Sequence, residues 1–460
     1  MAAFFPEDPE HRAQVAFACF LALFAFRYLR TFVGIYTWLT YPSTPRKAHP
    51  TFLPHRDVSV VIPTTFKTPA ELRKCIANIL ANQPAQVFVV TSTANLPALQ
   101  SFCDGQGVAH DVKCLGVAKL NKRKQILAAL QDVRTPIVAF ADDDVFWSST
   151  SFLHYMLAMF EDGRVGACGP RQCVRRSPNP NGWWFLGCAY LERRVWNNLT
   201  TQGVDGSIST LSGRTSLYRT SILRTDEFFH YFQTDAWLGR KLNSDDDKCL
   251  TRFVFSRGWD IRIQGDARAT IETTLEEDAK FLSQCLRWAR ARFRGNFTVM
   301  CNERYWYTRH LFGLYCIYVG SLQTPAFAVD GLLLGLLVAG HGSRLAIAAL
   351  VAWFLVSKVL KLVPHFVRHP RDLVFVPLSI AFSYVHGLLN LYALATLHHT
   401  AWGSQNLGPG EGQEDDYVRL RDPTPLCGVT DKAASDVGGS EHEFVVVEEV
   451  ETGEGVSKRK

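Results

Sequence analysis

The sequence predicts an α/β protein whose central domain is a doubly wound, Rossmann-like sheet and whose other parts are apolar helices. Two observations carry this prediction. Short β-branched and apolar runs alternate with helix-like segments through residues 58–141, which is typical of right-handed βαβ units. Apolar stretches at residues 13–39 and again after residue 305 are long enough to cross a membrane. A chain of 460 residues accommodates such a division into several parts.

The charge distribution separates a basic body from an acidic tail. The chain carries a net charge of +6, but residues 404–460 hold 13 acidic and 6 basic residues, which leaves the body near +13. A basic body favours anionic partners such as nucleotides, phosphates or an anionic membrane leaflet. The twelve cysteines form no CxxC pair, which favours a reducing compartment. No GxGxxG or GxxxxGK[ST] sequence occurs, so neither a conventional dinucleotide-binding fold nor a P-loop is supported.

The N-terminal region predicts a single membrane anchor. After a short segment of residues 1–12, residues 13–39 are almost entirely apolar and exceed the roughly 20 residues that a membrane helix needs. A cleaved signal peptide is the alternative, but the acidic start and the absence of a small-residue cleavage site argue against it. Residues 40–57 then read as a linker.

The central domain begins at residue 58. The expected strands are residues 58–62, 85–91, 109–115 and 137–141, and the expected helices are residues 71–82, 96–103 and 122–130. The fourth strand ends in Asp142, Asp143 and Asp144, at the sheet edge where open α/β folds bind ligands. Asp142 and Asp144 point to one side of an extended chain, which predicts a shared cation carrying phosphates. The alternatives are a solvated acidic turn and a helix cap.

Three further clusters of charged residues are candidates for chemistry. Lys122 and Arg123 begin a predicted helix, where cations are unfavourable unless an anion lies nearby; the alternative is a basic exposed turn. Asp246 and Asp247 lie in a crowded acidic run whose mutual repulsion leaves one carboxylate able to take a proton. The alternative there is that the helix dipole alone favours acidic residues in a first turn.

The third cluster is the sequence QCLRW. Gln284, Arg287 and Trp288 are spaced i, i+3 and i+4, which places them on one face of a helix. Arg287 suits a phosphate, and Trp288 offers a flat surface for a sugar ring. An amphipathic helix lying at a membrane surface is an equally compatible interpretation.

Apolar runs return at residues 310–327, 329–339, 345–363 and 373–397, which predicts three or four membrane passes. The basic loop of residues 364–371 prefers the cytosol, and this favours three passes. Residues 401–460 have the glycine-, proline- and acid-rich composition of a disordered tail.

In their order along the chain, these motifs resemble those of processive family 2 glycosyltransferases. The resemblance is to hyaluronan synthase-like and fungal capsule-type polysaccharide synthases in particular, and it covers roughly residues 58–404. It rests on the first strand ending at Pro63, the Asn-Lys-Arg helix start, Asp142–Asp144, Ser212-Gly-Arg214, Asp245-Asp-Asp-Lys248, the QxxRW sequence and Trp402-Gly-Ser404.

The resemblance implies a fold and an activity. Residues 58–304 would form a cytosolic GT-A domain, and residues 305–400 a membrane bundle in the plasma membrane. The implied reaction is the inverting, Mg²⁺- or Mn²⁺-dependent transfer of a sugar from a UDP-sugar donor to a growing polysaccharide, which is extruded through the membrane. Membrane lipid is a further implied partner, and no nucleic acid is. The alternatives are a non-processive transferase acting on a lipid, such as a ceramide glucosyltransferase-like protein, and an inactive membrane scaffold or transporter.

The resemblance also assigns roles to individual residues. Asp247 is the expected general base, with Asp246 beside it. Asp142 and Asp144 are the expected metal ligands. The expected nucleotide and diphosphate contacts are Pro63, Thr64, Lys122, Arg123, Asp142, Gln284 and Arg287, and the expected acceptor contacts are Ser212, Gly213, Arg214 and Trp288.

Three positions depart from the family pattern. Thr91 and Ser92 follow the second strand where an acidic residue is usual, so the nucleoside contacts are left unassigned. Arg214 replaces a proline, and Trp402-Gly-Ser-Gln replaces Trp-Gly-Thr followed by a base. A cytosolic Trp402 requires an even number of passes after Arg304, which conflicts with the charge of the loop at 364–371; the number of passes stays open.

Overall fold

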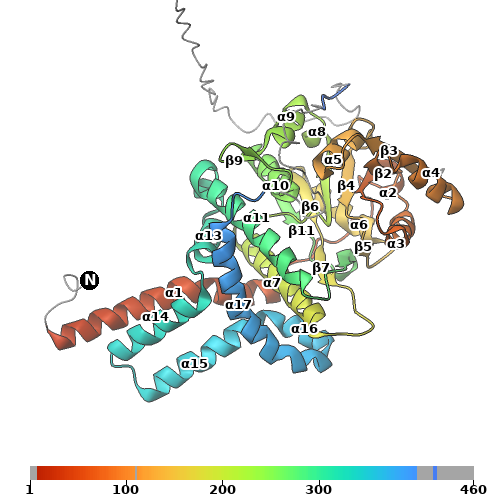
Figure 1. Ribbon diagram of the computed structural model, residues 1–460. Coiled ribbons are helices and arrows are strands. Elements are labelled where there is room, and N and C mark those ends of the chain that lie inside the picture. Colours follow the sequence, from red (N-terminus) through yellow and green to blue (C-terminus); the bar gives the residue numbers. More distant parts are fainter. Residues whose placement is uncertain (1–7, 109–110, 401–417, 422–460) are drawn as a thin grey trace, which may run out of the picture. The chain divides into compact units, whose positions relative to one another are not determined.

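The computed structural model describes residues 8–108, 111–400 and 418–421. Its central feature is a seven-stranded sheet in the order β11-β6-β8-β4-β1-β2-β3 (Figure 1). The strands are β1 (Val58–Pro63), β2 (Gln86–Ser92), β3 (Val112–Val117), β4 (Ile137–Ala141), β6 (Val165–Gly169), β8 (Thr215–Arg219) and β11 (Asp260–Ile263).

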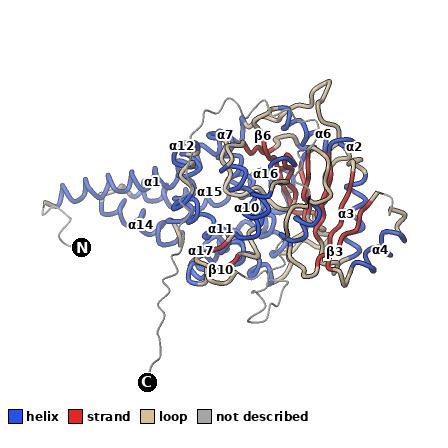
Figure 2. The backbone as a smooth tube through the Cα atoms, turned by 90° about the horizontal axis from the view of Figure 1, so that it is seen from above, coloured by secondary structure: helices blue, strands red, loops and turns tan. Residues whose placement is uncertain are grey.

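The parallel half of this sheet confirms the predicted alternation. Strand β1 pairs in parallel with both β2 and β4, and β2 pairs in parallel with β3. The connecting helices are α3 (Pro69–Leu80), α4 (Leu96–Gly105) and α5 (Lys122–Leu130), and α4 lies beside β3 at the sheet edge (Figure 2). The chain runs outward from β1 to β3 and then returns to β4, so the strand order reverses between β1 and β4. A crevice forms at such a reversal, outside the carboxyl ends of the strands.

Burial on both faces explains the uninterrupted apolar runs in the sequence. Every residue of β1 and of β4 is buried. Val61 and Phe140 belong to one hydrophobic cluster, whereas Val60 and Ala139 belong to the cluster on the other face. Neighbouring residues of a strand point to opposite faces, so a strand covered on both sides consists mostly of apolar residues. Ser59 is the polar residue of β1, and its buried hydroxyl accepts a hydrogen bond from the Thr135 hydroxyl at 2.8 Å.

Strand β8 departs from a purely parallel sheet. It pairs antiparallel with β4 on one side and with β6 on the other. Thr215 at the start of β8 is therefore opposite Ala141 at the end of β4. The turn before β8 lies next to the acidic residues after β4, and the Asp142 N–H donates to the Arg214 carbonyl at 2.9 Å. The reversed strand thus joins two motifs that are 70 residues apart in the sequence.

Smaller elements complete this domain. A second sheet contains β5 (Val145–Trp147), β12 (Thr270–Thr273) and β7 (Arg171–Val174), and a two-stranded sheet contains β9 (Ala236–Trp237) and β10 (Arg240–Lys241). The helices are α2 (Pro54–Asp57), α6 (Phe152–Leu157), η2 (Ala158–Glu161), α7 (Gly182–Asp205), α8 (Thr220–Leu223), α9 (Asp226–Thr234), α10 (Asp246–Ser256), η3 (Ala267–Ala269), α11 (Lys280–Asn302) and α12 (Trp306–Arg309).

Three helical segments are long and apolar enough to cross a membrane: Pro9–Thr40, Arg344–Arg368 and Pro370–Ala395. The first is α1, and the other two contain α15 (Arg344–Val359), η4 (Leu360–Leu362), α16 (Val363–Arg368), η5 (Pro370–Phe375) and α17 (Val376–Ala395). Helices α13 (Leu311–Leu322) and α14 (Ala326–Ala339) are bent by 94° and count as a fourth span only if they act as one. After residue 305 the described residues therefore contain two candidate spans, or three if the bent pair crosses as one, whereas the sequence predicted three or four there. The reason is that α13 and α14 have 12 and 14 residues, and each is too short to cross a membrane alone. The candidate span at Pro9–Thr40 agrees with the predicted N-terminal anchor.

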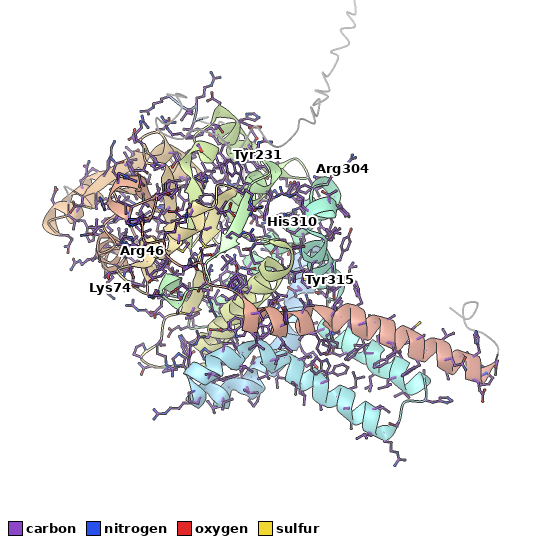
Figure 3. All side chains as sticks on the ribbon, turned by 180° about the vertical axis from the view of Figure 1, so that it is seen from behind. Arg46, Lys74, Tyr231, Arg304, His310 and Tyr315 are labelled. Carbon is purple, nitrogen blue, oxygen red and sulfur yellow. The ribbon has the colours of Figure 1, made fainter. Side chains whose placement is uncertain are left out.

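Polar contacts tie the apolar helices to one another. The Tyr315 hydroxyl on α13 donates to the Phe26 carbonyl of α1 at 2.6 Å (Figure 3). Asp330 on α14 pairs with Arg27 of α1 at 2.6 Å and with Lys358 of α15 at 2.9 Å. These buried charges lie inside candidate spans, where an isolated charge is costly, and each has a partner of opposite sign.

Residues 418–421 depart from the expected disorder of the tail. Gln233 exchanges two hydrogen bonds with the Val418 backbone, both at 2.9 Å. Gln131 bonds the Arg419 carbonyl and the Arg421 N–H at 2.7 and 2.9 Å, and Leu420 is buried in the main hydrophobic cluster. Two glutamine side chains and one leucine therefore hold this short stretch against α5 and α9.

Candidate active site

A cavity of about 750 Å³ opens at the carboxyl ends of β1 and β4, where the strand order reverses. Thirteen of the predicted site residues and one further aspartate line this cavity. These residues are Pro63, Thr64, Lys122, Asp142, Asp143, Asp144, Ser212, Gly213, Arg214, Asp246, Asp247, Gln284, Arg287 and Trp288, with Asp143 not among those predicted. Six of the sequence motifs, which are far apart in the chain, thus meet in one cavity.

The three aspartates after β4 face different partners. Asp143 accepts a hydrogen bond from the Thr64 hydroxyl at 2.5 Å, at the end of β1. Asp142 pairs with the Lys122 ammonium at 2.6 Å, and Asp144 accepts from the Thr274 hydroxyl at 3.1 Å. Burial, together with repulsion from Asp142, raises the pKa of Asp144 to about 6. Asp144 is therefore a half-buried carboxylate, and no cation among the described residues forms an ion pair with it.

The donor set at this position fits a divalent cation shared with a phosphate ligand. Within the described ranges, no group of three or more histidine, cysteine, aspartate or glutamate side chains could hold a metal alone. Asp142 and Asp144 supply two carboxylates. Mg²⁺ and similar ions are commonly held by one or two carboxylates plus the phosphates of a substrate. These two residues match that pattern, in which the nucleotide completes the coordination.

Lys122 links the two acidic clusters. Asn121 caps α5 by accepting from the N–H groups of Arg123 and Lys124. The Lys122 ammonium lies 2.6 Å from Asp142 and 3.3 Å from Asp246. Burial acts to lower the pKa of Lys122, but these carboxylates outweigh it and raise the pKa. Lys122 is consequently a fixed positive charge at the helix N-terminus, where an anion is also favoured by the helix dipole.

The absence of a side chain at Gly213 lets the backbone of this turn approach the ion pair between Lys122 and Asp246 closely. A Cβ atom at that position would lie 3.1 Å from the Lys122 ammonium and 3.4 Å from the Asp246 carboxylate. A larger residue would press on both groups. The turn of Ser212, Gly213 and Arg214 therefore packs directly over the lysine.

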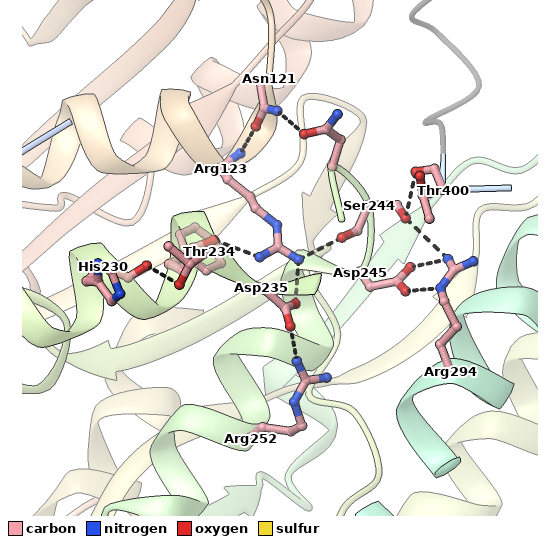
Figure 4. Close-up of polar contacts among 12 residues, drawn as sticks. Asn121, Arg123, His230, Thr234, Asp235, Ser244, Asp245, Arg252, Arg294 and Thr400 are labelled. Atoms are coloured by element: carbon pink, nitrogen blue, oxygen red, sulfur yellow. Dashed lines mark hydrogen bonds and ion pairs between the residues drawn. The ribbon is translucent and has the colours of Figure 1, made fainter. Parts of the chain in front are cut away.

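The predicted diphosphate contact of Arg123 requires a correction. Its side chain is buried and points away from the cavity, toward α9 (Figure 4). It donates to the Phe232 carbonyl at 2.7 Å, to Asp235 at 2.9 Å and to the Ser244 carbonyl at 2.7 Å. Successive residues on a helix are rotated by about 100°, so Lys122 and Arg123 cannot face the same ligand. The expected diphosphate contact of Arg123 does not fit this position, and its role is to hold α9 and the start of α10 in place.

Replacing Asp235 by asparagine is expected to destabilise the catalytic domain by about 3–5 kcal/mol, because the change removes the carboxylate that pairs with buried Arg123 and the nearer of the two carboxylates that pair with buried Arg252. Asp235 accepts from Arg123 and from Arg252 at 2.9 and 2.7 Å, and none of the three side chains is more than 9% exposed. Thermal unfolding of the purified full chain measures the effect. Asp266→Asn, which removes an ion pair with Arg268 at the surface, is the matched control and should unfold like the unmodified chain. Equal unfolding temperatures for both variants would contradict this role.

The three aspartates at the start of α10, residues 245–247, have different partners. Asp245 adopts a positive φ of 65° and is held by two hydrogen bonds from Arg294. Asp246 pairs with Lys122. Asp247 faces the cavity, and its nearest cation is Arg194 of α7 at 3.8 Å. Burial, and then repulsion from Asp246, raise the pKa of Asp247. Asp247 is thus the carboxylate best suited to accept a proton.

The QxxRW residues lie on α11 and face the same cavity. The amide oxygen of Gln284 is buried and has no hydrogen-bond partner within the described ranges, so a donor from a ligand would satisfy it. The Trp288 ring lies 4.7 Å from the Tyr190 ring, and the Arg214 guanidinium lies 5.4 Å from the Trp288 ring centroid. Two aromatic rings and a cation therefore form a surface of the type that binds sugars.

One face of α7 was not recognised in the sequence. Tyr190, Arg193, Arg194, Asn197 and Asn198 all line the cavity. They are spaced i, i+3, i+4, i+7 and i+8, which is the periodicity of a single helix face. The signal was present, but a polar stripe at this spacing is also typical of an exposed helix surface. Trp402, Gly403 and Ser404 lie outside the described residues.

Comparison with known proteins agrees with this geometry. The family model "Glycosyltransferase like family 2" matches residues 54–291. A "Type 2 glycosyltransferase" from Gibberella zeae is 40% identical over 417 residues, which cover 88% of this chain and 78% of that protein. A hyaluronan synthase from Streptococcus pyogenes is 24% identical over 208 residues, 44% of this chain and 47% of that protein.

A solved structure shares the fold. The mannosyltransferase PcManGT from Pyrobaculum calidifontis, in complex with GDP-Man and Mn²⁺, matches with a TM-score of 0.52 and 16% identity. The match covers 83% of this chain and 99% of that one. Sheet order, cavity and similarities together define an α/β glycosyltransferase of the GT-A type. More particularly, the chain belongs to glycosyltransferase family 2.

Proposed function

We propose that this glycosyltransferase moves a sugar from a UDP-sugar to a growing polysaccharide with inversion at the anomeric carbon. The observation that carries the proposal is the position of Asp247. This half-buried carboxylate has a raised pKa and shares one cavity with Lys122, Asp142 and Asp144. A proton acceptor and a phosphate-binding site in one cavity suit direct displacement by an acceptor hydroxyl.

In the proposed mechanism the acceptor hydroxyl oxygen attacks the anomeric carbon as the bond to the diphosphate oxygen breaks. Asp247 takes the hydroxyl proton, and UDP departs with the electron pair of the broken bond. Lys122 stabilises the negative charge that develops on the diphosphate. A divalent cation held by Asp142 and Asp144 would supply additional charge stabilisation at the leaving group. Gln284 and Arg287 orient the donor from the opposite wall.

Acceptor binding is assigned to the aromatic side of the cavity. Trp288 provides a stacking surface for the terminal sugar, and Ser212, Gly213 and Arg214 border it beside Lys122. Helix α11 carries Trp288 and is bound to α17, since Arg292 donates to Asn390 at 2.9 Å. This contact supports an acceptor site that lies next to a candidate membrane span. The proposal further places the catalytic domain at the cytosolic face of the plasma membrane and has the product extruded through the membrane.

The experiment that tests this function is release of UDP by the purified full chain in detergent with Mn²⁺. UDP-glucose, UDP-GlcNAc and UDP-glucuronate would be supplied singly and in pairs, and the product would be sized by gel filtration. Release that requires Asp247, with a product of high mass, is expected. A product that partitions with lipid would instead indicate the lipid-acceptor alternative. No release with any UDP-sugar would overturn the assignment of the donor class.

A further inference from the structure

Two cysteine sulfurs at the edge of the central sheet are in direct contact. Cys103 lies in the last turn of α4, and Cys114 lies on the edge strand β3 beside that helix (Figure 2). Their sulfur atoms are 3.6 Å apart, and of the eleven cysteines in the described ranges these are the two whose sulfurs meet. The S–S distance of a disulfide is about 2.05 Å, so an approach of about 1.5 Å would allow the bond to form.

The two thiols differ in their chemical character. The Cys114 thiol donates a hydrogen bond to the Cys103 sulfur, which lowers the pKa of Cys103 and raises the pKa of Cys114. Cys103 is therefore the thiol that ionises more readily, and the thiolate is the form that reacts with an oxidant. Cys103 is buried and Cys114 is half-buried, so the oxidant must be small and must enter past Cys114.

Strand β3 is held firmly on the side of Cys114. Cys114 is opposite Val89 in the parallel ladder between β2 and β3. At the end of the strand, the Thr93 N–H donates to the Val117 carbonyl at 2.9 Å. A Cβ atom at Gly116 would lie 3.1 Å from the Thr93 Cα, so the strand packs tightly against the turn that precedes α4. The approach of the two sulfurs therefore requires a movement of the end of α4 rather than of β3.

The end of α4 has room for such a movement. The helix ends at Gly105, and Gly107 follows with a positive φ of 69°. A Cβ atom added at either glycine would meet no atom within 4 Å. The surroundings of these two glycines therefore leave space for a small shift of the last turn, which carries Cys103.

The same turn of α4 supports a loop of the active-site cavity. Phe102 packs edge to face against Phe66, with the ring centroids 5.7 Å apart. Phe66 has a positive φ of 57°, which is unfavourable for a residue other than glycine and depends on support from its surroundings. Its N–H donates to the Thr64 hydroxyl at 2.9 Å, and that hydroxyl donates to Asp143 at 2.5 Å. Phe102 thus supports the loop of residues 64–67, which lines the cavity beside Asp143.

We propose that Cys103 and Cys114 form a reversible disulfide that weakens donor binding under oxidising conditions. Phe66 follows β1, which lies two strands inward from the edge strand β3. Closing the disulfide draws the end of α4 toward β3 and carries Phe102 away from Phe66, so the loop of residues 64–67 loses its support. Intracellular disulfides are usually transient and redox-sensing, which agrees with a reversible bond. The effect on the donor rests on the proposed function, because that function places the sugar nucleotide in this cavity.

The bond forms by oxidation with hydrogen peroxide, which is small enough to reach a buried thiolate. The Cys103 thiolate attacks one peroxide oxygen, the O–O bond breaks and hydroxide leaves, which gives a sulfenic acid at Cys103. The Cys114 thiolate then attacks this sulfur, and the S–S bond forms as the S–O bond breaks and a second hydroxide leaves. The two hydroxides take up the two thiol protons. Two thiols thus lose two electrons, and one hydrogen peroxide is reduced to two water molecules.

The experiment compares the purified full chain in detergent before and after treatment with hydrogen peroxide, which catalase then removes. After the remaining thiols are blocked, peptide mass spectrometry should detect a link between Cys103 and Cys114 that dithiothreitol reverses. Oxidation should weaken the binding of UDP with Mn²⁺ by about fivefold or more, the lower end of typical coupling between sites, and should speed amide exchange of residues 64–67. Cys114→Ser should show neither change. Cys301→Ser, at an exposed cysteine on α11, is the matched control and should respond like the unmodified chain.

Three outcomes would overturn the proposal: no linked peptide after oxidation, a linked peptide with unchanged UDP affinity and unchanged exchange of residues 64–67, or an equal loss of affinity in Cys114→Ser. Failure of the inference is distinguishable from failure of the proposed function. If the reduced chain does not bind UDP, the proposed donor is wrong, while the linked peptide and the amide exchange still decide the disulfide. Thermal unfolding under reducing conditions shows whether Cys114→Ser is folded, and Cys103→Ala supplies a second test of the same pair.

Discussion

Replacing Asp247 by asparagine is expected to lower kcat for sugar transfer by about 10²–10⁴-fold, the usual contribution of a general base. An amide of nearly the same size cannot take the acceptor proton, so the loss should appear in kcat more than in the donor KM. Initial rates of UDP release at saturating donor measure the effect. Asp266→Asn lies away from the cavity and should retain the unmodified rate.

The pH profile distinguishes a base from a merely structural carboxylate. The pKa of Asp247 is raised, and a base acts in its deprotonated form, so kcat should fall as the pH drops through that raised value. The acid limb should therefore begin above the pKa of about 3.9 that an unperturbed aspartate shows. A profile of unchanged shape in Asp247→Asn, or a loss of less than tenfold, would exclude Asp247 as the base.

Replacing Asp144 by asparagine is expected to lower metal-dependent transfer by about a hundredfold or more. A cation at the leaving group contributes several kcal/mol to the transition state, and each 1.36 kcal/mol corresponds to a factor of ten. Titration of Mn²⁺ against the protein with UDP, followed by electron paramagnetic resonance, measures binding separately from activity. The variant should need a much higher Mn²⁺ concentration in both assays.

Asp143→Asn is the matched control for the metal site. Asp143 is adjacent in sequence, but it accepts from the Thr64 hydroxyl and does not face the same partners as Asp142 and Asp144. Its replacement should change Mn²⁺ binding far less than Asp144→Asn. Equal losses in the two variants would mean that the acidic run acts as a whole, and that Asp144 has no special place at the cation.

Much of the site could be predicted because its parts lie on elements with clear sequence patterns. The run of residues 137–141 is buried on both faces, so Asp142 necessarily emerges at the carboxyl edge of the sheet. Gln284, Arg287 and Trp288 share a face because helical periodicity requires it. The positions of Lys122 and Gly213 in the cavity follow the same logic once the family resemblance supplies the order of the motifs.

Other features depend on contacts that no local pattern contains. Arg123 and Lys122 are chemically alike and adjacent, yet one meets Asp235 and the other meets Asp142. The choice depends on where α9 packs. The pairing of Arg194 with Asp247 joins residues that are 53 positions apart in the sequence. It exists because one face of α7 lines the same cavity as the start of α10.

The sequence by itself determined the parallel βαβ half of the sheet, the candidate membrane helices and the residues that meet at the strand ends. These properties are encoded locally, through hydrophobic periodicity and through the directions in which strands and helices present side chains. Only the tertiary structure decided the antiparallel insertion of β8, the burial of the Arg123 side chain against α9 and the meeting of residues from α7, α11 and the turn before β8 in one cavity. Each of these results from packing between distant segments, where the free energy of burying a charge depends on which partners the fold brings to it.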